Sequence, residues 1–402
     1  MLADDILLLA GLLLVALLVG WLTGRFSESR RARRDGSRGG LPGEYFRGLN
    51  FLLNEQSDKA LEVFIHMVEV DSETLETHFA LGSLFRRRGE VDRAIRIHQN
   101  LIARPNLSRS HRTQALFELG EDYLKAGLLD RAESLFSELA REKAHVEPAL
   151  RNLLLILEQQ KDWEKAVAVA RQLETVSGHY LNREIAHYYC ELAERELADR
   201  NWRIASRHLR RANAFDREAT RVALLSAQLA EGEGDHRRAL RHYRHALKVD
   251  SAKAALILPA LSRLFQSDKR PGEFDETIRQ LVRENPAATA SIAVAALRDS
   301  SITGQAVDEC IERYLESDSG FPELTALQRQ MEGLRKEDKP LTVRRLARVL
   351  LQQIHGEGYR YRCGECGYYG KTLYWQCPSC RQWDRFAPEF DLILSPRESR
   401  SR

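Results

Sequence analysis

Residues 81–101 read LGSLFRRRGEVDRAIRIHQNL and contain the pattern that decides the fold of this chain. Two amphipathic segments are separated by Gly89, a residue that readily ends one helix and turns the chain toward the next. Gly82 lies on the first segment, where the missing side chain lets another helix approach closely, and Phe85 follows one turn later. On the second segment, Ala94 precedes His98 by four residues. The stretch therefore predicts a hairpin of two packed helices.

The small residue of the second helix recurs at a nearly constant interval. Successive small residues are separated by 34, 38, 34, 39 and 34 positions, and the period of the tetratricopeptide repeat is 34 residues. Glycines precede the first three by twelve positions, at Gly48, Gly82 and Gly120. A generic amphipathic bundle does not explain this long period, so we predict a tetratricopeptide α-solenoid over residues 44–350. The six small residues are Ala60, Ala94, Ala132, Ala166, Ala205 and Ala239.

The later repeats depart from the pattern. In the fourth repeat, Leu154 and Leu157 replace the glycine and the aromatic residue. From Leu256 to about Leu350 the period weakens and prolines interrupt it. We expect six clear repeats followed by two or three degenerate ones. Solenoids of this type leave a concave groove that binds protein segments, but the residues that define the repeats serve packing and do not identify the partner.

Residues 1–24 predict a transmembrane anchor. The segment Ile6–Leu22 is apolar and uncharged, and at 1.5 Å rise per residue it is just long enough to cross a bilayer core. A cleaved signal peptide is the alternative. Against it, Asp4 and Asp5 stand where a signal peptide is basic, and no small-x-small cleavage site follows.

Residues 25–43 predict a basic, glycine-rich linker between the anchor and the folded domain. Because its arginines directly follow the apolar segment, the positive-inside rule places the rest of the chain in the cytoplasm. The same arginines are able to contact anionic lipid headgroups. They are Arg25, Arg30, Arg31, Arg33, Arg34 and Arg38.

The composition is that of a folded protein without a preference for nucleic acid. The 61 Lys and Arg residues against 58 Asp and Glu residues give a net charge of +3, which is too balanced to predict nucleic-acid binding. The six cysteines show no framework of disulfide pairs, as expected in a reducing compartment. Two of them, Cys190 and Cys310, lie in apolar helical contexts and are expected to serve packing.

Residues 357–390 predict a metal-binding domain, and a polar tail follows at 391–402. Cys363 and Cys366 form one Cys-x-x-Cys pair and Cys377 and Cys380 a second, so that four thiolates can surround one metal ion. Four thiolates suit zinc or iron, and their spacing does not choose between them. Without metal so short a segment has little core, although aromatic residues flank both pairs. These are Tyr368, Tyr369, Tyr374, Trp375, Trp383 and Phe386.

The two cysteine pairs resemble those of rubredoxin, whose family metal is iron. The intervening loop is shorter than in rubredoxins, and Arg381 stands where glycine usually follows the second pair. A structural metal knuckle that docks on the helices is therefore favoured over an electron carrier. The chain contains no phosphate-binding loop, HExxH motif, nucleophile elbow or dinucleotide fingerprint, so we expect it not to be an enzyme.

Over its whole length the chain resembles the lipopolysaccharide assembly protein B family of Gram-negative bacteria. The resemblance rests on the anchor, the run GLNFLLNEQSDKA from Gly48, the run from Leu81 quoted above and YWQCPSC from Tyr374. It implies an anchor in the cell inner membrane and a rubredoxin-like site whose ligands are the four paired cysteines. We therefore expect an all-α fold with a transmembrane helix, a solenoid and a small C-terminal metal knuckle.

The same resemblance implies the partners. The family acts as an adaptor that restrains lipid A synthesis, because it promotes degradation of the UDP-acyl-N-acetylglucosamine deacetylase by a membrane-embedded AAA+ metalloprotease. A role in gathering other lipopolysaccharide assembly enzymes is also implied. Two other classes stay open: a rubredoxin-like electron carrier, which reversible bleaching of iron absorption would reveal, and a membrane assembly scaffold unrelated to lipid A, which co-purifying partners would reveal.

Overall fold

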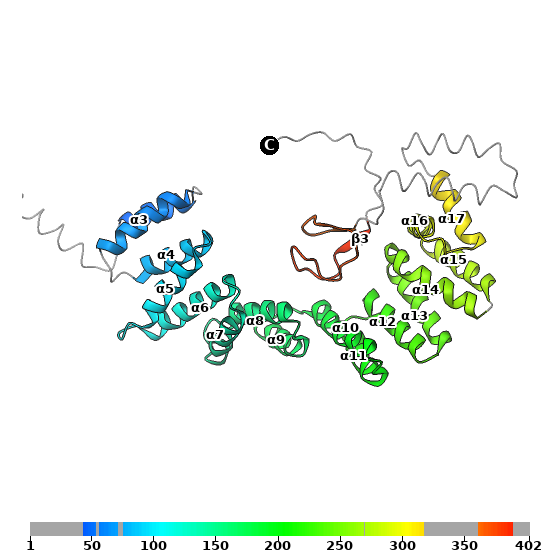
Figure 1. The fold of residues 1–402 in the computed structure, drawn as a ribbon, viewed down its shortest axis with the longest axis horizontal. Coiled ribbons are helices and arrows are strands. Elements are labelled where there is room, and N and C mark those ends of the chain that lie inside the picture. Colours follow the sequence, from blue (N-terminus) through cyan, green and yellow to red (C-terminus); the bar gives the residue numbers. More distant parts are fainter. Residues whose placement is uncertain (1–42, 54–55, 71–74, 269, 317–360, 389–402) are drawn as a thin grey trace, which may run out of the picture. The chain divides into compact units, whose positions relative to one another are not determined.

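The computed structural model describes residues 43–53, 56–70, 75–268, 270–316 and 361–388 of the chain (Figure 1). They form two compact units that meet between Ala149 and Leu150, and each is described by itself. Within this described part of the chain, no helix is both long and apolar enough to span a bilayer. The predicted anchor Ile6–Leu22, the linker up to residue 42, residues 317–360 and the tail 391–402 lie outside the described residues.

The first unit contains three helical hairpins, and the helices of each hairpin pack against each other. In this unit Ser108 caps α6, because its hydroxyl accepts a hydrogen bond from the backbone N–H of His111 at 3.2 Å. The turns within the second and third hairpins are made by Gly89 and Gly127, both with positive φ, as predicted for Gly89. The helices are α2 Gly43–Leu53, α3 Ser57–Val70, α4 Leu75–Arg87, α5 Val91–Ile102, α6 Arg109–Lys125 and α7 Leu129–Arg141.

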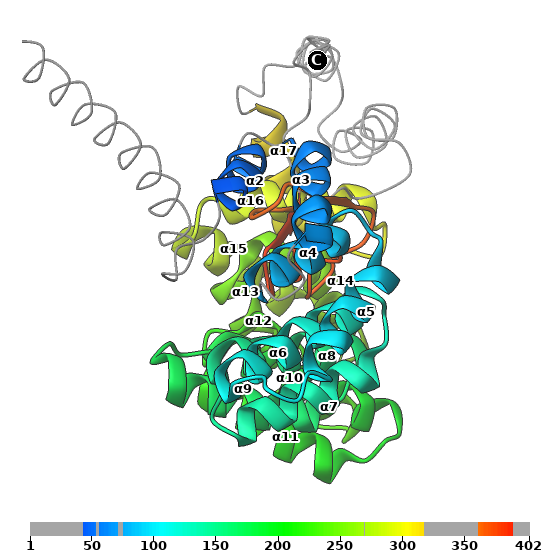
Figure 2. The ribbon, with the colours of Figure 1, turned by 90° about the vertical axis from the view of Figure 1, so that its left-hand side faces the viewer.

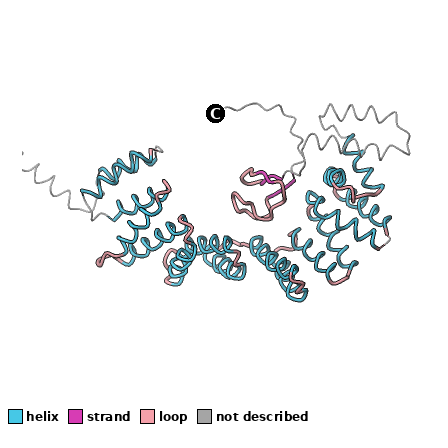
Figure 3. Tube along the Cα trace, in the orientation of Figure 1, coloured by secondary structure: helices cyan, strands magenta, loops and turns pink. Residues whose placement is uncertain are grey.

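The second unit continues the series of hairpins and ends in a small domain of strands (Figures 1 and 3). Helix α8, Val146–Gln160, crosses the boundary between the units. The other helices are α9 Trp163–Ser177, α10 Asn182–Ala198, α11 Trp202–Phe215, α12 Thr220–Gly232, α13 His236–Val249, the 3-10 helix η1 Ser251–Lys253, α14 Ala254–Ser267, α15 Pro271–Glu284, α16 Ala288–Arg298 and α17 Gln305–Glu316.

The repeat pattern read from the sequence is the packing pattern of the core. All six repeat alanines are fully buried. Each of the three predicted glycines lies under the large residue of the second helix, so that an added Cβ would clash and force the helices apart. The pairs are Gly48–Phe64, Gly82–His98 and Gly120–Phe136, in which the Cβ would lie 2.6, 2.4 and 2.8 Å from the nearest ring atom.

The fourth repeat exchanges the sizes of the two positions. Leu154 stands where the first three repeats have glycine, and Ala170 stands where they have a large ring. Ala170 belongs to a buried cluster in the second unit, and the half-buried Leu154 packs against that cluster. The large side chain between the two helices thus comes from the first helix instead of the second. This explains why the repeat departs from the sequence pattern and still folds as a hairpin.

The last two hairpins of the described chain are the degenerate repeats expected after the sixth. Pro271 is the first residue of α15, a position where proline is compatible with a helix, and Pro286 lies just before α16. The hairpins α14–α15 and α16–α17 share one apolar core with α12 and α13. The solenoid therefore has eight hairpins among the described residues.

One buried position of the first unit holds a polar ring instead of an apolar one. His98 occupies the place that Phe136 occupies in the next repeat, and its Nδ1 lies 2.5 Å from a carboxylate oxygen of Asp122, with both side chains fully buried. Arg86 lies 2.7 Å from Asp122 and 2.6 Å from Glu118. The Asp122 cluster, which we define as Arg86, His98, Glu118 and Asp122, joins the second and third hairpins.

The C-terminal domain is a small antiparallel sheet, so the all-α prediction holds for the solenoid only (Figure 3). Its strands are β1 Tyr361–Cys363, β2 Tyr369–Gly370 and β3 Phe386–Pro388, in the order β2-β1-β3. The prediction expected a metal knuckle and no strands. It missed β3 because this strand follows the second cysteine pair and is only three residues long.

Candidate metal centre and its docking surface

Two tight turns place the four cysteines. The first turn follows β1, where Cys363 pairs with Phe386 of β3, and the backbone N–H of Gly367 donates to the carbonyl of Cys363 at 3.0 Å. In the second turn, the N–H of Arg381 donates to the carbonyl of Cys377 at 2.9 Å. Both turns end in a left-handed residue, Gly367 with φ of 74° and Arg381 with φ of 59°. The two turns are therefore alike although the second lacks the glycine.

The four predicted ligands come together at one point. All four sulfur atoms lie within 4.8 Å of one another, with Cys363 and Cys380 at 3.6 Å and Cys366 and Cys377 at 3.7 Å. A metal ion bound tetrahedrally at 2.3 Å from each thiolate separates the sulfurs by about 3.8 Å. The spacing therefore fits one zinc or iron ion. It does not distinguish between them.

The pKa values of the thiols also favour the binding of a cation among them. A backbone hydrogen bond with Tyr368 lowers the pKa of Cys366 to about 6. Although the backbone at Gln382 favours ionisation of Cys380, its interactions with the other three sulfurs raise the pKa of Cys380 to about 12. The thiols cannot all ionise at this spacing on their own. A divalent cation among them would stabilise four thiolates.

The core of the metal domain is small. The buried cluster at its centre contains Tyr361, Cys363, Cys377 and Phe386, and two of these four are candidate ligands. A core of this size does not offset the conformational entropy of folding about thirty residues, so the domain needs the metal or the solenoid to stay folded.

The flanking aromatic residues divide into three groups, whereas all six were predicted to surround the cysteine turns. Phe386 belongs to the core of the metal domain. Trp383 is buried within the solenoid cluster, and Trp375 packs against the same helices. Three tyrosines stay largely exposed, namely Tyr368, Tyr369 and Tyr374. The tryptophans therefore join the domain to the helical stack.

Trp383 is the centre of this junction. Its ring stacks on His187 of α10 with centroids 4.9 Å apart and lies edge-on to Trp163 and Tyr188. Its indole N–H donates to Glu158 of α8 at 3.2 Å. The same carboxylate accepts a hydrogen bond of 2.6 Å from the hydroxyl of Tyr188, whose pKa burial raises far above its ordinary value.

Further polar contacts surround the tryptophans. Gln376 donates a third hydrogen bond to Glu158, at 3.0 Å. Trp375 lies between two cations, with Arg221 and Lys253 at 5.5 and 5.2 Å from its ring centroid. Lys253 also pairs with Asp384 at 2.7 Å. We call this set the docking surface, formed by Trp375, Gln376, Trp383 and Asp384 of the metal domain and by Glu158, His187, Arg221 and Lys253 of the solenoid.

Burial sets the charge states within the docking surface. Burial, reinforced by the charge of Arg221, lowers the pKa of His187 to about 3, so the ring is neutral at neutral pH. Although burial alone would favour the protonated acid, the charge of Lys253 holds the pKa of Asp384 below its usual value. The junction therefore contains one neutral imidazole and a compensated ion pair.

Arg381 has a structural role that explains its unusual conformation. One of its guanidinium nitrogens donates to the carbonyl oxygen of Leu155 in α8 at 3.4 Å. With the amide of Gln159 oriented so that its oxygen faces the guanidinium, that oxygen accepts two further bonds of 2.9 and 2.8 Å. A left-handed arginine costs about 1 kcal/mol relative to glycine, and these contacts offset that cost.

The sequence contained no signal for the solenoid half of the docking surface. Glu158, His187, Arg221 and Lys253 are single polar residues on amphipathic helices and look like ordinary surface residues. Arg221 and Lys253 are in fact only 3% and 5% exposed, because the metal domain covers them. Such residues become recognisable only when the two modules are seen together.

Cys190 and Cys310 are packing residues, as predicted. Both are buried in the solenoid, in separate clusters. Burial raises the pKa of Cys190 to about 12 and that of Cys310 to about 11, so both remain protonated thiols at neutral pH.

Comparison with known proteins supports both modules. The tetratricopeptide repeat family matches residues 77–110 and 114–178, and the rubredoxin metal binding domain matches residues 361–388. Lipopolysaccharide assembly protein B of Escherichia coli K12 is 34% identical over 381 residues, which cover 94% of this chain and 96% of that protein. This chain belongs to the lipopolysaccharide assembly protein B family. A second member, from Haemophilus influenzae, is 31% identical over 94% of this chain and 96% of its own length. Family membership thus covers the solenoid and the metal domain together.

Proposed function

We propose that this protein is a membrane-anchored cytoplasmic adaptor of lipopolysaccharide assembly and not an enzyme. The observation that carries the proposal is the similarity over 94% of the chain to proteins named for lipopolysaccharide assembly. The architecture supports it, because tetratricopeptide solenoids bind protein segments along an extended surface. The similarity extends over 96% of each of these relatives, and the metal domain of this chain matches the rubredoxin metal binding domain family.

The metal domain has a structural role in this proposal. One ion is held by Cys363, Cys366, Cys377 and Cys380, and iron is favoured by the resemblance to rubredoxin, with zinc as the alternative. When bound, the metal neutralises the thiolates and holds the two turns together. Trp375 and Trp383 then attach the domain to the helices, so that the metal fixes the shape of the surface offered to partners.

The client and the protease are the proposed partners. The adaptor brings the UDP-acyl-N-acetylglucosamine deacetylase to a membrane AAA+ protease and so restrains lipid A synthesis. The segment Ile6–Leu22 acts as a single-pass anchor in the inner membrane, and the arginines of residues 25–38 keep the solenoid in the cytoplasm. Tethering raises the effective concentration of the solenoid toward partners in the same membrane.

The test is the half-life of the deacetylase after translation is stopped. We expect rapid turnover with the full chain and slow turnover in a null strain. Turnover should also be slow with a chain that lacks residues 1–22, when this truncated chain is present at the same level as the full chain. Normal turnover with the truncated form would refute the tethered adaptor. Normal turnover in the null strain would refute any role in proteolysis of this enzyme.

A further inference from the structure

Two consecutive second helices of the solenoid, α11 and α13, are strongly basic. Neither contains an aspartate or a glutamate. Arginines recur at intervals of three and four on α11, so that they share one helical face. The basic residues of the two helices are Arg203, Arg207, His208, Arg210 and Arg211 on α11 and His236, Arg237, Arg238, Arg241, His242, Arg244, His245 and Lys248 on α13.

A cavity of about 360 Å³ lies between α11, α12 and α13, within the second unit. Its wall contains Arg210, Arg217, Arg238, His242 and His245, together with hydroxyl and amide side chains that are able to donate hydrogen bonds. No carboxylate is found among the described residues that line it. Apolar side chains form the rest of the wall. The remaining lining residues are Ser206, Leu209, Asn213, Val222, Ala223, Ser226 and Leu229.

Two of the three arginines in this cavity are not compensated by a carboxylate among the described residues. Arg210 and Arg217 are exposed and have no ion-pair partner among the described residues. Arg238 does have one, because it pairs with Glu233 at the start of α13. Burial and then the charge of Arg238 lower the pKa of His242, which indicates a positive local potential.

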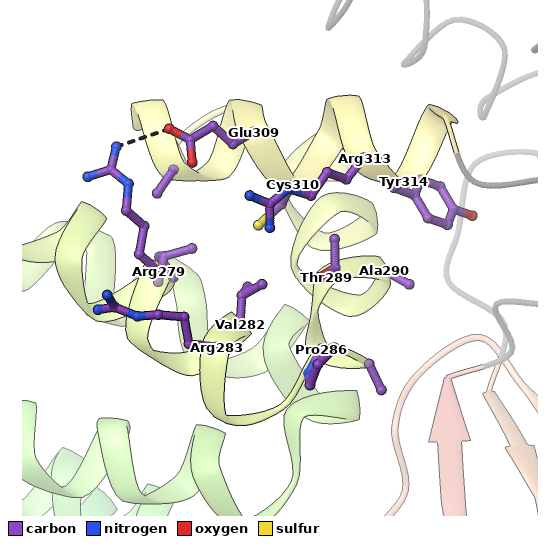
Figure 4. Close-up of a pocket in the computed structure, with 13 residues that line it drawn as sticks. Arg279, Val282, Arg283, Pro286, Thr289, Ala290, Glu309, Cys310, Arg313 and Tyr314 are labelled. Atoms are coloured by element: carbon purple, nitrogen blue, oxygen red, sulfur yellow. Dashed lines mark hydrogen bonds and ion pairs between the residues drawn. The ribbon is translucent and has the colours of Figure 1, made fainter.

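The larger cavity between α15, α16 and α17, of about 650 Å³, provides a contrast (Figure 4). Two of its three arginines have carboxylate partners, and the third, Arg313, has no ion-pair partner among the described residues. Arg279 lies 3.1 Å from Glu309 on the facing helix, and Arg283 lies 2.6 Å from Glu276. Carboxylates therefore neutralise most of the arginine charge in that cavity, whereas two of the three arginines in the cavity on α11 and α13 keep their charge.

We propose that the cavity between α11, α12 and α13 binds a phosphate ester. A single carboxylate has one negative charge and would leave one of the two unpaired guanidinium groups uncompensated. A phosphate monoester carries nearly two charges at neutral pH and offers three acceptor oxygens. Two free guanidinium groups suit these oxygens, and the apolar wall leaves space for a small organic group. The phosphate belongs either to a soluble metabolite or to a lipid headgroup.

The experiment uses the full chain in nanodiscs, with hydrogen exchange of residues 206–217 and 238–245 as the readout. In the first arm, glycerol 3-phosphate is titrated onto protein in phosphatidylcholine discs. In the second arm, the discs contain phosphatidic acid and no soluble phosphate is added. Protection in the first arm assigns a soluble ester, and protection in the second arm alone assigns a lipid headgroup.

Matched variants test the site itself. Arg210→Gln with Arg217→Gln should weaken binding about tenfold or more, because charge-assisted hydrogen bonds are lost. Arg203→Gln with Arg207→Gln removes equal charge from exposed positions on α11 outside this cavity, and binding should weaken less than about threefold. Equal losses in both pairs would show general charge attraction and overturn the proposal. So would protection in neither arm, or equal protection by acetate at the same ionic strength.

Discussion

The Asp122 cluster of the first unit and the docking surface of the second unit are both buried and polar. The cluster depends only on neighbouring helical hairpins, whereas the docking surface depends on a separate domain. The members of the Asp122 cluster come from adjacent hairpins, at most 36 residues apart in the chain. The docking surface joins Glu158 to Trp383 across 225 residues and Lys253 to Asp384 across 131. The first is part of the repeat stack itself, whereas the second exists only when a separate domain is folded.

This difference predicts different modes of failure. Loss of a group from the Asp122 cluster leaves a charge buried inside a helical stack that has no alternative arrangement. Loss of the docking surface exposes tryptophans and cations, but the solenoid underneath keeps its helix-to-helix contacts. The metal centre should therefore control the docking surface without controlling the fold of the repeats.

The largest expected effect comes from removing two ligands. In Cys363→Ser with Cys377→Ser, residues 361–388 should lose the metal and unfold, since metal binding supplies about 10 kcal/mol or more to domains of this size. The metal content measured by elemental analysis should fall from one ion per chain to near zero. Hydrogen exchange should rise in residues 361–388 and in α10 and α12, but not in α4 to α6. Ser379→Ala, an exposed position between the two ligands of the second turn, is the control and should retain the ion.

The second effect concerns the Asp122 cluster. Asp122→Ala leaves His98 buried without its carboxylate and Arg86 with Glu118 alone, and should lower the free energy of unfolding by about 3 kcal/mol. Chemical denaturation monitored by exchange in α4 to α7 measures this. Asp58→Ala, which removes a largely exposed carboxylate paired with Arg88, should cost less than about 1 kcal/mol. An equal loss of unfolding free energy in the two variants would show that the buried cluster stabilises the protein no more than an exposed ion pair does.

A third, smaller effect is a pH dependence of docking. His187 has a pKa of about 3 when docked, against about 6.5 in an exposed imidazole. As the pH falls from about 6.5 toward 3, only the undocked state takes up this proton, so docking should weaken progressively; above about 6.5 this residue should have no effect. The depressed pKa of Asp384 adds a further loss below about pH 4. Tryptophan fluorescence should follow the release, and His187→Phe should remove the dependence between pH 6.5 and 4.

The smallest effect is expected at Arg381. Glycine at this position relieves the cost of the left-handed backbone but loses the contacts with Leu155 and Gln159. The two changes nearly cancel, so Arg381→Gly should change stability by less than about 1 kcal/mol while the domain leaves α8 more often. Faster exchange of α8 at unchanged metal content is the expected result. Slower exchange would show that the strain outweighs the contacts.

Much of the fold could be predicted because its determinants repeat. The alanines at the 34-residue interval and the glycines twelve residues before them pack against each other in the structure, so pattern and contact coincide. The four cysteines were predictable for a similar reason, since two short turns bring them together. The fourth repeat shows the limit, because Leu154 and Ala170 conserve volume while each position alone departs from the pattern.

The docking surface could not be predicted in detail. Trp375 and Trp383 were recognised as aromatic residues of the metal domain, but nothing in their local sequence shows that they point away from it. Glu158 lies near the end of an amphipathic helix, where a glutamate is common. Its significance comes from three donors that reach it, from Tyr188, Gln376 and Trp383, and two of these are more than 200 residues away. Local patterns contain no information on such contacts.

The most direct test of the account separates docking from metal binding. Glu158→Arg changes only the solenoid side and places a cation opposite the side-chain N–H groups of Gln376 and Trp383. Glu164→Arg, at an exposed position on α9, is the matched control. The measurement is the half-life of the deacetylase in cells, together with the metal content of the purified chain. We predict one ion per chain in both variants, slow turnover with Glu158→Arg and normal turnover with Glu164→Arg. Normal turnover with Glu158→Arg, in a chain whose metal domain is shown by hydrogen exchange to be released, would contradict the claim that the adaptor works through a docked metal domain.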